Sequence, residues 1–150
     1  MAAMMQRRHF LLCLVTCPLV ACESAPPDGQ DESTRLRLVG TWLRAYDEQG
    51  VRVRRVLVLN NDGTFQESAS MQPGDGIVPQ TISGGSGDWL FDGTNLKRHY
   101  RLINGKPTAA PTVPFVTFEI RFTSRTEFVG INRVRRLKVV YQRVQDGTQL

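Results

Sequence analysis

The sequence predicts an all-β fold, an eight-stranded antiparallel up-and-down barrel. Between residues 39 and 144, apolar and polar residues alternate with the two-residue period of strands that bury one face. Turn signals such as Asp-Gly and Asn-Gly interrupt this alternation at short intervals. No window of helical length shows a convincing helical period, so the sequence predicts no helix in the domain.

The first half of the domain contains four expected strands, at 39–46, 51–59, 64–71 and 88–91. A turn at 47–50 follows the first strand. The second strand, rich in valine and arginine, ends at the Asn-Asn-Asp-Gly turn of 60–63, where Asp-Gly supplies the positive φ of a hairpin. Residues 72–87 are rich in glycine and proline and are expected to form a long irregular loop before the short aromatic fourth strand.

The second half contains the other four strands, at 95–103, 115–122, 127–131 and 137–144. Asn-Gly ends the fifth strand, and a second long loop with three prolines occupies 104–114. The sixth strand alternates most cleanly, and its apolar face is expected to point inward. This face carries Val116, Phe118, Ile120 and Phe122.

The long and the short loops are expected at opposite ends of the barrel. In a meander, the odd-numbered connections lie at one end, and these include both long loops: 47–50, 72–87, 104–114 and 132–136. The even-numbered connections are all tight: 60–63, 92–94 and 123–125. A barrel with an open mouth and a closed base explains this sorting, whereas a Greek-key sandwich, the alternative, gives no reason for it.

The first 21 residues have the layout of a secretory signal. Arg7 and Arg8 precede an apolar run at 10–20 that is too short to span a membrane. The next feature, Leu19-Val20-Ala21-Cys22, resembles the lipobox of bacterial lipoproteins, in which the cysteine is acylated and becomes the new N-terminus. The resemblance implies lipidation of Cys22 and attachment to a membrane of the bacterial cell envelope. Glu23 stands where an aspartate is associated with inner-membrane retention, which favours the outer membrane, facing the periplasm.

The expected organisation is a signal peptide at 1–21, a flexible tether at 22–36 and a barrel domain at 37–147. The tether is polar and contains proline and glycine. Cys13 and Cys17 would leave with the signal, so neither a disulfide nor a cysteine metal site is expected. The chain has 19 Lys and Arg against 14 Asp and Glu, an excess too mild to indicate binding of nucleic acid.

Two short motifs extend the resemblance into the domain. Gly40-Thr41-Trp42 opens the first strand, and Arg143 lies in the last. In lipocalins a Gly-x-Trp begins the first strand, and an arginine from the last strand packs across the indole at the closed end. With the phrase at 57–65 and Gly-Asp-Trp at 87–89, the domain is similar to small bacterial lipocalin-like lipoproteins. The resemblance implies that Gly40, Trp42 and Arg143 hold the closed end.

Catalytic and metal-binding patterns are missing from the sequence. His99 is the only histidine after the signal, and its neighbours are cationic. There is no His-x-x-x-His, no nucleophile elbow and no phosphate-binding loop, so no metal, cofactor or enzymatic activity is expected. Glu67 and Glu119 could meet as paired carboxylates, but outward-facing charge is the default expectation.

Cations flank the first and seventh loops, which are odd-numbered and therefore expected at the open mouth. These cations are Arg52, Arg54, Arg55, Arg133, Arg135, Arg136 and Lys138. They could focus an electric field on an anionic ligand, or simply form a solvated rim. We therefore expect a carrier of a small hydrophobic or anionic ligand. The alternative is a periplasmic protein-binding module, such as an inhibitor, an immunity protein or an envelope-assembly factor, that acts through its loops. Large side chains filling the interior would favour this alternative.

Overall fold

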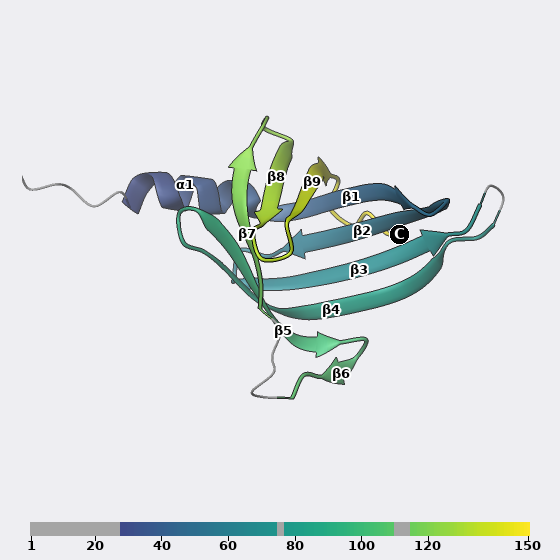
Figure 1. Ribbon diagram of the computed structural model, residues 1–150. Coiled ribbons are helices and arrows are strands. Elements are labelled where there is room, and N and C mark those ends of the chain that lie inside the picture. The colour runs from purple at the N-terminus through teal and green to yellow at the C-terminus, as the bar shows by residue number, and fades with distance from the viewer. Residues whose placement is uncertain (1–27, 75–76, 110–114) are drawn as a thin grey trace, which may run out of the picture.

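The computed structural model describes residues 28–74, 77–109 and 115–150, which form one helix and nine strands. The helix α1 covers Asp28–Leu38. The strands are β1 (Gly40–Glu48), β2 (Val51–Leu59), β3 (Thr64–Gln72), β4 (Gln80–Phe91), β5 (Asn95–Ile103), β6 (Lys106–Pro107), β7 (Phe115–Phe122), β8 (Glu127–Asn132) and β9 (Leu137–Val144). Figure 1 shows α1 projecting from one end of a strongly curved sheet.

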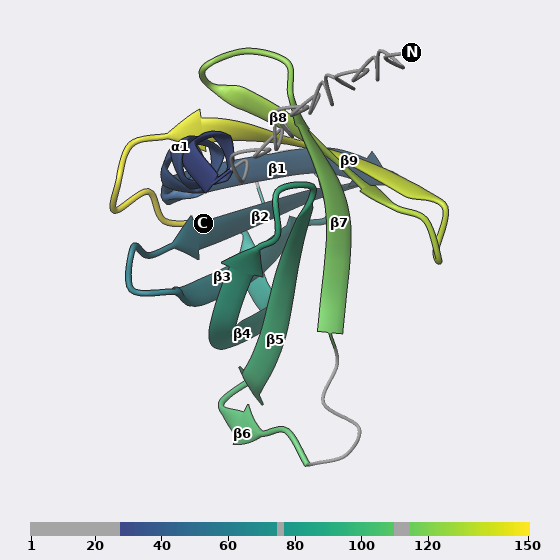
Figure 2. The ribbon, with the colours of Figure 1, turned by 90° about the vertical axis from the view of Figure 1, so that its left-hand side faces the viewer.

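Eight of these strands form a closed antiparallel barrel. Their order is β4-β3-β2-β1-β9-β8-β7-β5, and pairing between β4 and β5 completes the ring. The two-residue β6 only extends β5 as a hairpin. Viewed from the α1 end, the strands surround a common interior (Figure 2). This architecture confirms the fold class that the alternation and the turn spacing predict.

The helix α1 identifies the closed end of the barrel. It lies against each of the tight turns that follow β2, β4 and β7. Arg35 and Arg37 donate to the carbonyl oxygens of Asn61 and Ser124, and the Asp31 carboxylate lies close to Gly93. The turns after β1, β3 and β8 and the longer connection after β5 lie at the other end, which we call the open end. The two longest connections, at 73–79 and 104–114, are both at the open end as predicted, although the first is shorter than the predicted loop at 72–87 and the turn after β1 is only 49–50.

The prediction of a flexible tether over residues 22–36 is wrong for residues 28–36, which belong to α1. Residues 22–27 lie outside the described part of the chain. The sequence of α1 has no apolar stripe, but Leu38 at its end is completely buried and Arg35 donates to the carbonyl oxygen of Asn61 at 2.7 Å. Tertiary contacts of this kind supply most of the stability of helices in proteins. No helix in the described residues has the length and hydropathy of a membrane span.

The strand β4 is longer than predicted, because it begins at Gln80 inside the stretch expected to be a loop. Its glycines allow close packing against β5. A Cβ on Gly87 would overlap the carbonyl oxygen of His99, and one on Gly85 would lie 2.7 Å from the ring of Tyr100. The register between β4 and β5 also shifts next to Gly87, which marks a β-bulge. Glycine therefore signals close backbone approach here, not a loop.

Large side chains fill the closed half of the barrel. The buried cluster consists of Leu38, Trp42, Leu57, Leu59, Phe65, Trp89, Leu96, Phe118, Phe128, Val139 and Tyr141. Phe128 is central, since its ring meets Trp42 edge-on at 4.6 Å between centroids and stacks on Tyr141 at 5.0 Å. The apolar face of β7 belongs to this cluster or packs against it, as predicted.

Candidate functional site

The closed end is held by the residues that carry the lipocalin resemblance. Arg143 lies over the indole of Trp42, with its Cζ 4.4 Å from the ring centroid. The same guanidinium donates to the backbone carbonyls of Val39, at 2.9 Å, and of Arg37. Gly40 has a φ of +129°, and a side chain there would clash with the Arg143 guanidinium. These contacts fix α1 against β1 and β9.

The three arginines of β2 do not form one group. Arg55 faces the interior, where its Nε donates to the Tyr46 hydroxyl at 3.4 Å. Strand alternation then places Arg52 and Arg54 on the outer surface. Only one of the three cations is therefore available to the barrel interior.

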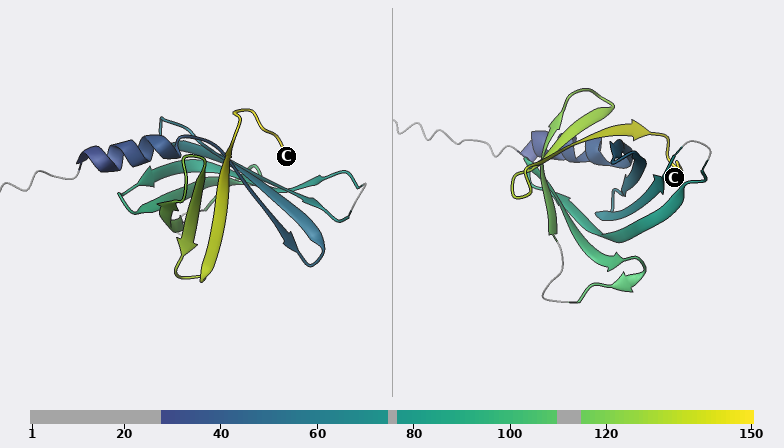
Figure 3. Two further views of the ribbon diagram at one scale, coloured as in Figure 1. Left: turned by 90° about the horizontal axis from the view of Figure 1, so that it is seen from above. Right: turned by 45° about the vertical axis from the view of Figure 1, so that its right-hand side comes forward.

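The remaining predicted cations lie on the β8–β9 hairpin. Arg133 pairs with Glu119 of β7, with 2.5 Å between Nη2 and Oε2. Arg135 and Arg136 are exposed in the turn, and Lys138 is exposed at the start of β9. This hairpin and the β1–β2 turn are both at the open end, but Figure 3 shows their tips diverging. The structure thus brings the two groups of cations to the same end without joining them in one ring.

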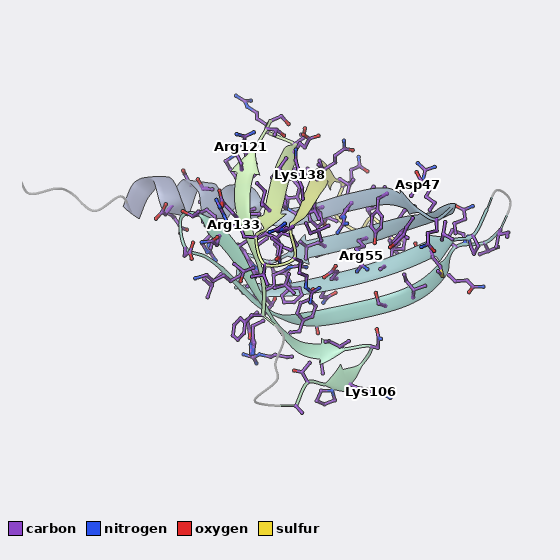
Figure 4. The ribbon with its side chains drawn as sticks, in the orientation of Figure 1. Asp47, Arg55, Lys106, Arg121, Arg133 and Lys138 are labelled. Carbon is purple, nitrogen blue, oxygen red and sulfur yellow. The ribbon has the colours of Figure 1, made fainter. Side chains whose placement is uncertain are left out.

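Polar side chains occupy inward positions on the open side of the apolar core. We call this set the interior polar cluster, and it consists of Arg44, Tyr46, Arg55, Glu67, Arg98, Tyr100 and Tyr141. Five strands contribute to it: β1, β2, β3, β5 and β9. Arg55 is labelled in Figure 4, near the middle of the curved sheet.

Glu67 is the centre of this cluster. Its Oε2 accepts a hydrogen bond from Arg98 Nη1 at 2.6 Å and another from the Tyr100 hydroxyl. Its Oε1 lies 3.5 Å from Nη1 of Arg55. The side chains of Glu67 and Arg98 are only 10% and 4% exposed. The ion pair is therefore buried, and its charge-assisted hydrogen bonds are of the stronger kind.

The pKa values in the cluster reflect this arrangement. Burial alone would raise the pKa of Glu67, but the charge of Arg98, the Tyr100 hydroxyl and the charge of Arg55 together hold it below its usual range. Burial opposes the charge of Arg98 as well, yet Glu67 keeps the pKa of Arg98 above its ordinary value. Burial raises the pKa of Tyr100, which stays a neutral hydrogen-bond donor. The cluster is thus charged at Glu67 and at its arginines and neutral at Tyr100 near pH 7.

Among the described residues, Arg98 is the most buried cation. Its Cζ lies 5.6 Å from the ring centroid of Phe65 and 5.9 Å from that of Phe118. Its Nε is buried and has no hydrogen-bond partner among the described residues. A buried donor without a partner costs about 1–3 kcal/mol, so one Glu67 carboxylate does not fully satisfy this guanidinium.

A small cavity of about 120 Å³ adjoins the cluster. It is lined by Arg55, Glu67, Tyr100, Ile103 and residues 83–85 of β4. The space is well below the roughly 300 Å³ at which pockets for drug-sized ligands begin. A cavity of this size accommodates a small molecule or a single side-chain-sized group.

On the open side of the cluster, the side chains of Arg44, Tyr46 and Arg55 contact one another in sequence. The Arg44 guanidinium lies over the ring of Tyr46, with Cζ 4.3 Å from the centroid, and Tyr46 in turn accepts from Arg55. In all, the cluster contains three guanidinium groups and one carboxylate, that of Glu67. Its net charge is positive.

Sequence reasoning missed most of this cluster. Glu67 and Glu119 do not meet, because Glu67 points inward and Glu119 pairs with Arg133 outside. Arg98 appears in the sequence as part of an exposed basic run, but the residue is only 3% exposed. A signal was present, because Arg98 shares its strand face with Leu96 and Tyr100.

His99 lies on the outer face of β5. Its ring stacks on Phe115, with 4.6 Å between centroids, and its Nδ1 is 3.8 Å from Asp88. Within the described residues, no three His, Cys, Asp or Glu side chains gather as a metal site would require. Cys22, the predicted lipidation site, lies outside the described residues.

Comparison of the sequence with known protein families and with curated proteins finds no match.

Proposed function

We propose that the protein binds a small anion in the interior polar cluster of its barrel, as a binding protein and not as an enzyme. The observation that carries this proposal is the excess of two positive charges inside the cluster, with Arg98 almost fully buried. Electrostatic attraction is stronger in a partly buried site than in water, so such an interior favours an anionic ligand. Arginine presents paired N–H donors that match carboxylate and phosphate groups.

The same proposal includes a place in the cell. We propose that Cys22 is lipidated and that the barrel is anchored to the outer membrane of a bacterial cell envelope, facing the periplasm. The signal layout with Arg7 and Arg8, and the lipobox-like Leu-Val-Ala-Cys at 19–22, support this location. The lipocalin-like barrel is compatible with such a ligand-binding module.

The alternative is a protein-binding module that acts at the open end. One observation favours it: large aromatic side chains fill the closed half, which leaves no room there for a bulky hydrophobic ligand. The anionic group that the cluster binds could then belong to a partner protein.

Anion binding is tested by titrating the full-length protein with inorganic phosphate and, separately, with succinate, by calorimetry. We expect Arg55→Gln to weaken binding about tenfold or more, since hydrogen bonds to charged groups contribute about 1.5–3 kcal/mol. Arg54→Gln is the matched control, because it removes the neighbouring charge from the outer face. Equal losses in both variants, or no binding of either anion to the unmodified protein, would contradict the proposal.

The anchor is tested by growing expressing bacteria with labelled palmitate. We expect label in the unmodified protein and in Cys17→Ser, and none in Cys22→Ser. An unlabelled wild-type product would show that Cys22 is not acylated.

A further inference from the structure

The barrel is joined only weakly between its first and last strands. Only three residues of β1, Thr41 to Leu43, pair with β9. Yet β1 continues to Glu48, and β9 begins at Leu137. On their other sides, β1 pairs with β2 over all nine of its residues, and β9 pairs with β8 over its first six. Figure 3 shows the two strands diverging toward the open end.

The direction of the backbone groups along this gap follows from one hydrogen bond. The N–H of Arg143 donates to the carbonyl oxygen of Thr126, on the β8 side, at 2.7 Å. Because backbone groups alternate between the two neighbours of a strand, Gln142 faces β1, and Leu43 opposite it faces β9. The same alternation turns the N–H and C=O of Ala45 and Asp47 toward the gap. Both residues are exposed, and within the described part of the chain no strand pairs with them on that side.

The charges beside the gap are mostly positive. Arg44 and Arg55 belong to the interior polar cluster, next to the free part of β1. The β9 side carries the exposed cations Arg135, Arg136 and Lys138. Asp47 and Glu48 are the carboxylates on the free part of β1, and Glu67 is the carboxylate of the cluster. Five cations therefore stand against three anions beside the gap. Figure 4 shows Asp47 and Lys138 lying apart on their diverging hairpins.

We propose that the free edge of β1 accepts an extended acidic segment of a partner protein as an added strand. Main-chain hydrogen bonds from Ala45 and Asp47 would hold the segment, as in other cases of strand addition. Every second side chain of an added strand points to the same face, so alternate acidic residues reach the interior beside Arg44 and Arg55. This inference rests on the proposed anion site, because the same arginines receive the carboxylates of the segment.

The test uses a short synthetic peptide in which Glu and Thr alternate, titrated against the full-length protein. The control peptide has the same composition, with its glutamates grouped at one end. In the protein, Ala45→Pro removes the N–H that faces the gap and spares the pairing of β1 with β2. We expect this variant to keep the melting temperature of the unmodified protein and to bind the alternating peptide about tenfold more weakly, as the loss of main-chain hydrogen bonds implies.

Each outcome separates the edge from the anion site. Loss of peptide binding in Ala45→Pro, with phosphate binding retained, supports strand addition. Equal binding of both peptides, or undiminished binding to Ala45→Pro, overturns it while leaving the anion site standing. If Arg55→Gln changes neither phosphate nor peptide binding, the anion site itself is wrong. Dimerisation of the free protein that Ala45→Pro abolishes would assign the edge to a second copy of the chain and overturn the acidic partner.

Discussion

At the closed end, Trp42 is completely buried among aromatic rings and is covered by the Arg143 guanidinium, which also binds two backbone carbonyls. In the open half, Glu67 and Arg98 are nearly as buried, but they form an ion pair with an unpaired donor beside it. Apolar packing at the closed end stabilises the fold directly. A buried ion pair contributes little net stability, because desolvation offsets much of its attraction.

This difference indicates what each half is for. The closed half resembles the core of any small domain and gives no reason to expect a ligand. The open half retains charges that stability alone does not require, which is the physical ground for placing function there. Mutations in the two halves should therefore behave differently.

Trp42→Ala is expected to have the largest effect. Deleting a fully buried large side chain leaves a cavity, and Phe128 and Arg143 lose the ring that they contact. We expect a loss of about 3–5 kcal/mol in the free energy of unfolding, measured by urea denaturation. An unchanged unfolding midpoint would contradict the assignment of Trp42 to the closed-end core.

In the polar cluster, a single substitution should lower the free energy of unfolding more than a double substitution does. Glu67→Leu leaves the buried Arg98 guanidinium without its counter-ion, and we expect a loss of about 3–4 kcal/mol. Glu67→Leu combined with Arg98→Met removes both charges, and the double variant should recover most of that loss. The same denaturation series measures this coupling. If the double variant is as unstable as the two single losses added together, the ion pair is not the source of the effect.

The pH dependence of stability should distinguish Glu67 from other carboxylates. The pKa of Glu67 is lower in the folded than in the unfolded protein, so its ionised form stabilises the fold above the unfolded value of about 4.3. This contribution is lost as the pH falls below that value through the folded pKa. In Glu67→Gln, stability measured from pH 6 to pH 2 should therefore fall less steeply than in the unmodified protein. Parallel curves would show that Glu67 titrates normally.

The sequence was sufficient for the barrel and for its closed end. Alternation and turn residues define seven of the eight strands closely, and Gly40, Trp42 and Arg143 form the contacts that their resemblance implies. These features depend on local patterns, which a sequence displays directly. The prediction of a loop at 72–87 was wrong from Gln80 onward, because the glycines there belong to β4 and allow it to pack closely against β5.

The polar cluster and the helix were harder to predict, because both depend on contacts between distant segments. Glu67 and Arg98 are 31 positions apart, and Arg35 of α1 reaches Asn61 across the chain. A charged residue on an alternating strand is normally exposed, and only an opposite charge makes its burial tolerable, here from β5 to β3 across β4. That partnership requires the register between strands, which single-strand patterns do not contain.

The smallest predicted effect concerns the attachment of α1 to the closed end. Arg35 lies over the ring of Trp89, with Cζ 5.3 Å from the centroid, and donates to the carbonyl oxygen of Asn61. Since the side chain is partly exposed, Arg35→Ala should cost only about 0.5–1.5 kcal/mol in global stability. Its clearer effect should be faster hydrogen exchange of the amides of α1, with exchange in β2 and β3 unchanged. Uniform acceleration throughout the barrel would mean that α1 and the strands open as one unit, and that the closed end is not a separate support for the fold.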